Sequence, residues 1–180
     1  DHVVIGLIGE KALAITGLSS LDSNQSTNIA QGTISRINDT NLFLCVVSTV
    51  LAQQWFDAIS EGSNTSNNLT ITQQNTWTQQ QIASGISHVT TDSQDLFIPQ
   101  ELNYDLINGI SFTKGCYKGQ EIIARLHYRG SYKQRACRFQ CETDIEPKPG
   151  TSIYSENTAQ PCGQVIQSTT TNNGVELLAV

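Results

Sequence analysis

The chain has 180 residues, of which 38% are hydrophobic and only 14% charged, and its net charge is −6. This length suits one ordinary domain or two small ones, and the apolar fraction is low but sufficient for a packed core. No apolar run approaches the roughly 20 residues that cross a bilayer, and nothing at the start resembles a secretory signal. We therefore expect a cytoplasmic protein without a membrane partner.

The first part of the chain predicts a compact α+β unit. In chain order we expect a buried strand, a short helix, two strands joined by a turn, a second helix, a polar loop and a short strand, at residues 3–9, 10–18, 33–37, 41–47, 51–59, 60–68 and 69–72. A strand, a helix, two paired strands and a helix in this order are typical of a ferredoxin-like unit.

The second part begins with a helix at 75–84 that ends at Gly85, followed by a long extended passage. A helical turn at 102–106 and a helix at 121–128 come next. From residue 134 onwards short strands alternate with turns, at 135–142, 151–155, 163–167 and 175–180. This pattern predicts part of an antiparallel β unit, such as a small barrel.

The segment 114–121, Lys-Gly-Cys-Tyr-Lys-Gly-Gln-Glu, places Cys116 between two lysines and two glycines, directly before a predicted helix. A helix N-terminus carries free N–H groups and a partial positive charge, and nearby lysines act in the same direction. A cysteine in this setting is expected to have more thiolate than a free cysteine. The alternative interpretation is a glycine turn that holds a small buried cysteine.

The other four cysteines predict inert thiols in a reduced protein. Cys45 lies in an apolar run and is expected to be buried. Cys137 and Cys141 are four residues apart in a predicted strand and would share one face, but no histidine or further close cysteine pair completes a metal site. Cys162 follows a proline in a predicted loop. We therefore predict no bound metal.

Basic residues are concentrated in one window. Residues 114–138 hold seven of the ten basic residues and a single acid, Glu121, so this window carries +6 and the rest of the chain −12. A basic segment in an acidic chain suggests an anionic ligand, either nucleic-acid phosphates or the carboxylates of a small molecule. The alternative is a solvated helix face followed by a basic strand.

These residues resemble a known family. The segment 114–121 is similar to the K-G-C-[FY]-x-G-Q-E signature of YgfZ-type folate-binding proteins, and 97–103 is similar to the F-I-P-Q-x-L-N segment of that family. The stretches 4–9, 109–112 and 124–130 agree as well. YgfZ-type proteins are related to the T-protein of the glycine cleavage system, a tetrahydrofolate-dependent aminomethyltransferase.

The resemblance implies a fold with ferredoxin-like portions and a C-terminal β-barrel around a folate channel. It places a folate-binding α+β domain of the GcvT/YgfZ type at 1–133 and part of the small antiparallel barrel at 134–180. By this comparison the chain is a fragment without the N-terminal portion and the last barrel strands. The absence of any methionine also suggests a longer natural product.

The resemblance also implies a site for tetrahydrofolate or a derivative. Trp77 matches a family tryptophan that contacts folate, and an indole offers a pterin a stacking face. The motif and its helix supply the other expected contacts, namely Lys114, Tyr117, Gln120, Glu121 and Arg125. One position departs from the family, because Ala83 stands where many members carry a glutamate that can bind the pterin edge.

The function implied is that of an accessory protein that supports iron–sulfur cluster assembly or maintenance and thereby tRNA modification, with Cys116 as the functional thiol. Its expected partners are folate and iron–sulfur enzymes, including tRNA-thiolating ones. One alternative is an aminomethyltransferase of T-protein type, so the sequence leaves open whether the protein is an enzyme. A second alternative is a module that contacts RNA directly through the basic window.

Overall fold

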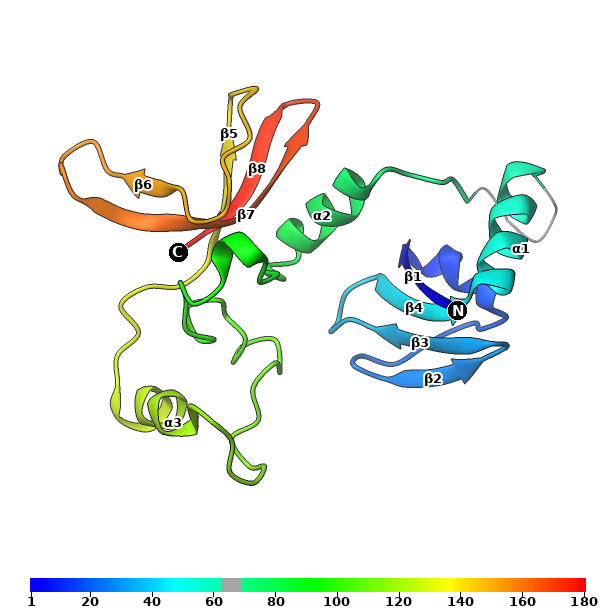
Figure 1. Ribbon diagram of the computed structural model, residues 1–180, viewed down its shortest axis with the longest axis horizontal. Helices are drawn as coiled ribbons and strands as arrows, with labels where there is room; N and C mark the ends of the chain where they lie inside the picture. The colour runs from blue at the N-terminus through cyan, green and yellow to red at the C-terminus, as the bar shows by residue number, and fades with distance from the viewer. Residues whose placement is uncertain (63–68) are drawn as a thin grey trace. The chain divides into compact units, whose positions relative to one another are not determined.

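The computed structural model describes residues 1–62 and 69–180 and divides into two compact units, Asp1–Trp77 and Thr78–Val180 (Figure 1). Each unit contains a four-stranded antiparallel sheet together with helices. The predicted α+β class is therefore confirmed. The assignment of 1–133 and 134–180 to two domains of the family stays a prediction.

The first unit is a sheet of four antiparallel strands in the order β1-β4-β3-β2. These strands are β1 (His2–Ile8), β2 (Ser26–Ile29), β3 (Gly32–Arg36) and β4 (Leu42–Ser48). A 3-10 helix, η1 (Glu10–Thr16), follows β1, and α1 (Thr49–Ser60) follows β4. Ser48 begins α1 as its N-cap, because its hydroxyl accepts a hydrogen bond from the Leu51 N–H at 3.2 Å.

The core of the first unit lies on one face of this sheet. Alternate residues of β4 point into it, and Phe43, Cys45 and Val47 are fully buried. Trp55 of α1 and Leu13 of η1 pack into the same cluster. Both helices therefore cover the same face, as the apolar spacing of α1 predicts.

One predicted strand of the first unit is absent, and one observed strand was not predicted. Residues 69–72 form no strand, although Leu69 packs against the core. A segment with high β propensity forms a strand only when an adjacent strand supplies backbone hydrogen bonds. Propensity alone does not show whether such an adjacent strand exists. Strand β2 was not predicted, because three of its four residues are polar and show no apolar pattern. Of the predicted loop at 60–68, residues 63–68 lie outside the described part of the chain.

The second unit contains α3 (Gln120–Arg129), a short 3-10 helix η2 (Thr91–Ser93) and four strands. The boundary between the units falls within α2 (Gln74–Ala83). As predicted, Gly85 follows the end of α2, with a positive φ of 67° that suits glycine. Of the four predicted helices longer than one turn, three are present as α1, α2 and α3, and the one predicted at 10–18 is the 3-10 helix η1.

The strands of the second unit form an antiparallel sheet in the order β5-β8-β7-β6, which curls as half of a barrel (Figure 1). They are β5 (Cys137–Cys141), β6 (Ser152–Tyr154), β7 (Pro161–Thr171) and β8 (Gly174–Ala179). Val165 and Val175 are buried on one side of the sheet, and Ile166 and Leu178 pack with Ile82 of α2 on the other.

Residues 106–134 contain the motif and contribute no residue to the two apolar clusters of this unit. No residue of α3 is buried. Both ends of the excursion are held by Arg135, whose guanidinium forms a two-pronged ion pair with Asp105 at 3.0 and 2.8 Å. The same group donates to the Gln100 carbonyl at 3.3 Å and to Asn103 Oδ1 at 3.1 Å. We call this group of contacts the Arg135 clamp.

A second polar contact holds α3 itself. Gln100 is fully buried, and its Nε2 donates to the Ile123 carbonyl at 2.8 Å. Next to it, Asn103 Nδ2 donates to the Ala136 carbonyl and the Ala136 N–H to the Glu101 carbonyl, at 2.8 and 2.7 Å. The position of the motif therefore depends on hydrogen bonds more than on apolar packing.

None of the helices formed by residues 1–62 and 69–180 is both long and apolar enough to span a bilayer.

The core of the first unit gives a test of stability. We expect Phe43→Ala to lower the free energy of unfolding by about 3–5 kcal/mol, because it leaves a cavity under the sheet. Phe56→Ala is the matched control, since Phe56 is 52% exposed, and it is expected to cost less than about 1 kcal/mol. Urea denaturation followed by Trp55 fluorescence measures both, and equal losses would contradict the assigned core.

The Arg135 clamp gives a test that depends on pH. The hydrogen bonds from Arg135 lower the pKa of Asp105, so the clamp stabilises fully above the ordinary Asp pKa of about 3.9 and is lost as the pH falls through the lowered value. We expect Asp105→Asn to speed hydrogen exchange at the Ala136 amide near neutral pH.

This difference between wild type and Asp105→Asn is expected to shrink as the pH falls from about 4 through the lowered pKa of Asp105, because protonation of Asp105 then removes the ion pair from the wild type. Asp144→Asn is the control, since Asp144 is exposed and forms no ion pair in the described part of the chain. A difference that persists unchanged at low pH would show that the ion pair does not hold this segment.

Candidate functional site

The motif presents its thiol to solvent. Cys116 is exposed in the loop that leads into α3. Gly119 is the N-cap residue of α3 and has a φ of 86°, a left-handed conformation that glycine adopts without strain. The predicted placement of Cys116 before a helix is confirmed, and the alternative of a small buried cysteine is wrong.

The loop around Cys116 is held by its own residues. Gln120 Oε1 accepts a hydrogen bond from the Tyr117 N–H at 3.1 Å, which ties the loop to the first residue of α3. The Lys114 ammonium lies 4.4 Å from the centre of the Tyr117 ring, in a cation–π contact. The Lys114 N–H donates to Ser111 Oγ at 3.2 Å. These contacts flank Cys116 on both sides and leave its sulfur accessible.

Glu121 and Arg125 lie one helical turn apart on α3, and both are exposed. Their spacing suits an ion pair, yet neither belongs to an ion pair among the described residues. Both charges therefore remain available to a ligand. Of the five residues of the motif and its helix that are predicted to bind folate, Lys114, Tyr117 and Gln120 shape the loop, and Glu121 and Arg125 present their charges on the helix.

Trp77 lies in the first unit, against the sheet. A Cβ added at Gly6 would lie 2.5 Å from Cε3 and 2.7 Å from Cζ3 of Trp77, so the indole is in direct contact with the backbone of β1. Gly6 pairs with Leu44 and Val4 with Val46 on the sheet face opposite the core. Val4 is 64% and Val46 43% exposed, so the indole adjoins an open apolar surface.

Ala83 is exposed at the end of α2 in the second unit. A methyl group there cannot accept a hydrogen bond, so Ala83 offers no acceptor side chain to a ligand.

The remaining thiols differ sharply in environment. Cys45 is fully buried, and burial raises the pKa of its thiol to about 12, so it stays protonated at neutral pH. Cys137 is exposed and Cys141 partly buried on β5. Within residues 1–62 and 69–180, no three His, Cys, Asp or Glu side chains gather as a metal site.

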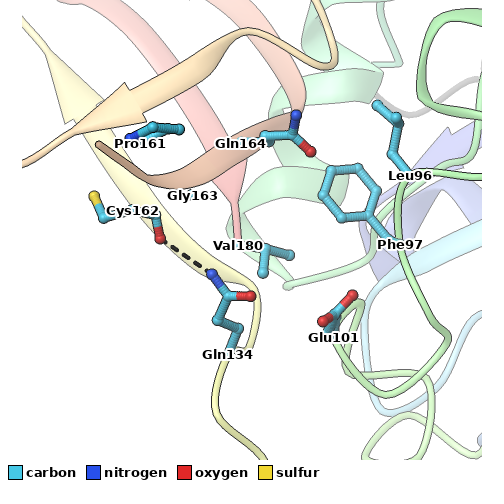
Figure 2. A pocket seen from close by; sticks show the side chains of 9 residues that line it. All are labelled: Leu96, Phe97, Glu101, Gln134, Pro161, Cys162, Gly163, Gln164 and Val180. Carbon is cyan, nitrogen blue, oxygen red and sulfur yellow. Dashed lines mark hydrogen bonds between the residues drawn. The ribbon is translucent and has the colours of Figure 1, made fainter. Parts of the chain in front are cut away.

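The structure also contains a cavity that sequence reasoning missed. Figure 2 shows it in the second unit, with a volume of about 230 Å³, between Phe97 and Glu101 on one side and Gln164 and Val180 on the other. Gln134 Nε2 donates to the Cys162 carbonyl at 3.1 Å across its rim. Its lining comes from four separate chain segments, so no local pattern in the sequence points to it.

The sequence matches no family model but is similar to several curated proteins. The tRNA-modifying protein YgfZ of Aliivibrio fischeri strain MJ11 is 30% identical over 154 residues, which cover 85% of this chain and 46% of that protein.

The YgfZ protein of Yersinia enterocolitica is 33% identical over 139 residues, with 74% and 40% covered, and that of Photobacterium profundum is 32% identical over 134 residues, with the same shares. The chain spans less than half the length of these curated relatives. Their similarity extends across most of the present sequence, including the motif and its helix, and the chain belongs to the YgfZ family.

Proposed function

We propose that the chain is part of a folate-binding accessory protein that supports iron–sulfur cluster assembly or maintenance and thereby tRNA modification. The observation that carries this proposal is the exposed Cys116 on a loop braced by its neighbours, in a chain similar to proteins named as tRNA-modifying. The five free cysteines suit a reducing compartment, and we propose that the protein acts in the cytoplasm.

Cys116 acts as a single thiol in this proposal. Iron–sulfur clusters are generally held by several thiolates, and no second cysteine belongs to the motif. A transient role fits an exposed single sulfur best, as a nucleophile, a redox thiol or one ligand during transfer of a cluster to a client enzyme. Lys114 and Lys118 flank the sulfur in sequence.

The residues around Trp77 fit a folate. A pterin is flat and heteroaromatic, and the open apolar face beside the indole offers it a surface of the same character. Contact of a folate with Glu121 and Arg125, which belong to the second unit, stays a prediction from the sequence. Tetrahydrofolate carries one-carbon units when bound. Because Ala83 provides no carboxylate, we propose that stacking contributes more to binding here than recognition of the pterin edge.

The arrangement of the first unit supports the ferredoxin-like fold as part of the proposal. If β2 is left out, the sheet order is β1-β4-β3. In chain order these are the first, third and second strands, which is the order of neighbouring strands in a βαββαβ unit. Both η1 and α1 cover the same face of the sheet. In the sequence, residues 69–72 follow α1, at the point where such a unit has its last strand. No residue described above specifically favours the aminomethyltransferase alternative. Cys116 and Ala83 make this alternative less favoured than the accessory role.

Folate binding is tested by calorimetric titration of the full-length protein with tetrahydrofolate. We expect Trp77→Ala to raise Kd about 3–10-fold, because it removes one aromatic stacking contact. Gly6→Ala should raise Kd as well, since the added methyl group displaces the indole. Trp55→Phe is the control, because Trp55 lies in the core. An unchanged Kd in Trp77→Ala would remove the indole from the site.

The role of the thiol is tested by complementation of a strain that lacks the gene, with tRNA thiolation measured by mass spectrometry. We expect Cys116→Ala to leave thiolation near the level of the deletion strain, at equal protein abundance. Cys137→Ala should restore it, since Cys137 is also exposed but lies outside the motif. Full restoration by Cys116→Ala would rule out a chemical role for this sulfur.

A further inference from the structure

Helix α3 and its flanks expose an aromatic and basic surface that the proposed role of Cys116 does not use. We call it the α3 surface, and it consists of Phe112, Arg125, His127, Tyr128, Arg129 and Lys133. No residue of α3 is buried, and Tyr128 is 70% exposed. An exposed aromatic side chain on a helix without a buried face is typical of a surface that contacts a partner.

The aromatic rings of this surface are held in place before any partner arrives. Phe112 stacks on His127 with ring centres 3.8 Å apart and planes 19° from parallel. Tyr128 packs edge-on against His127, with ring centres 4.7 Å apart at 82°. Three rings from two chain segments thus form a packed cluster, and the Tyr128 ring remains open to solvent.

The structure separates the seven basic residues of the window into two groups. Arg135 and Arg138 form ion pairs with Asp105 and Glu176. The other five are exposed and form no ion pair within the described ranges; they are Lys114, Lys118, Arg125, Arg129 and Lys133. The basic window is therefore partly structural, and the unpaired charges lie on α3 and its two flanking loops.

The geometry of α3 brings two of these charges together beside the tyrosine. Arg125, Tyr128 and Arg129 stand at positions i, i+3 and i+4, which share one face of a helix. Like charges at this spacing repel each other mildly, and an anionic partner would relieve that repulsion. Lys133 lies four residues after Arg129, beyond the end of the helix.

We propose that the α3 surface binds an unpaired segment of RNA, with a base stacked on Tyr128 and phosphates at Arg125, Arg129 and Lys133. Alternating cations and open aromatic rings suit a single strand, because a base held inside a duplex has no free face to stack. The carboxylates of a folate tail would use the cations but not the tyrosine. This inference rests on the proposed role in tRNA modification and names a direct contact for it.

The test uses the full-length protein and a fluorescent, unstructured RNA oligonucleotide, with binding followed by anisotropy. With three phosphate contacts, affinity should fall about 20-fold between about 50 and about 200 mM salt. A duplex of the same sequence should bind more weakly. Equal or tighter binding of the duplex would overturn the stacking arrangement, and absence of binding to the single strand would overturn the whole proposal.

Two variants separate the base contact from the phosphate contacts. Tyr128→Leu should weaken binding at least about fivefold and leave the salt dependence unchanged. The double variant Arg129→Gln/Lys133→Gln should weaken binding and reduce the slope of log affinity against log salt by about 1.4. Lys11→Gln/Lys148→Gln removes the same charge at two exposed positions elsewhere and should bind as wild type does.

Two further outcomes decide between partners. If the Lys11/Lys148 control loses as much affinity as Arg129→Gln/Lys133→Gln, binding follows net charge alone and the α3 surface is not the site. If Tyr128→Leu binds RNA normally but no longer associates with an iron–sulfur enzyme, the surface docks protein instead. Calorimetry with tetrahydrofolate should give the same Kd for Tyr128→Leu as for wild type, so failure of this inference is distinguished from failure of the folate proposal.

Discussion

The Arg135 clamp is the contact on which the position of the motif depends. Arg135 stands at the start of the β-rich part of the chain and joins Asp105, Asn103 and the Gln100 carbonyl, all on the far side of the excursion 106–134. Charge-assisted hydrogen bonds of this kind each contribute about 1.5–3 kcal/mol. Since α3 buries no residue, these bonds and the contact from Gln100 to the Ile123 carbonyl replace the apolar packing that usually fixes a helix. Closing a loop of this length costs little more than closing a shorter one.

A motif held in this way suits a protein that must present side chains to partners. Binding segments are commonly drawn from the less stable parts of a fold, because a side chain that packs in the core is unavailable to a ligand. Here the loop before α3 is ordered by its own residues, through the Gln120 contact to the Tyr117 N–H and the Lys114–Tyr117 pair. Cys116 therefore gains a defined position without being buried. The strained backbone at the start of α3 falls on Gly119, where it has the least cost.

Local patterns in the sequence predicted the helices and the glycines at their ends. They did not predict strand pairing or side-chain contacts between residues that lie far apart in the chain. Helix α1 follows from the spacing of its apolar residues, the end of α2 from Gly85 and the start of α3 from Gly119. The failures are of another kind: residues 69–72 have the composition of a strand but no partner, and β2 has a partner but a polar composition. In the site, the placement of Cys116 directly before a helix follows from the residues of the motif, and its exposure is known from the structure. The contact of Trp77 with Gly6 joins residues 71 positions apart and has no local signal in the sequence.

The same limit applies to charge, and it changes the meaning of the basic window. Counted along the sequence, Arg135 and Arg138 belong with the cations that await an anion, yet each already has a carboxylate partner from a distant strand or turn. What remains is a set of cations on α3 and its flanks, in a chain whose other residues carry −12. An acidic remainder repels a polyanion from most of the surface, so the charge pattern both attracts an anionic partner to α3 and disfavours its binding elsewhere. Because selectivity is a difference between sites, the acidic residues contribute to it together with the arginines.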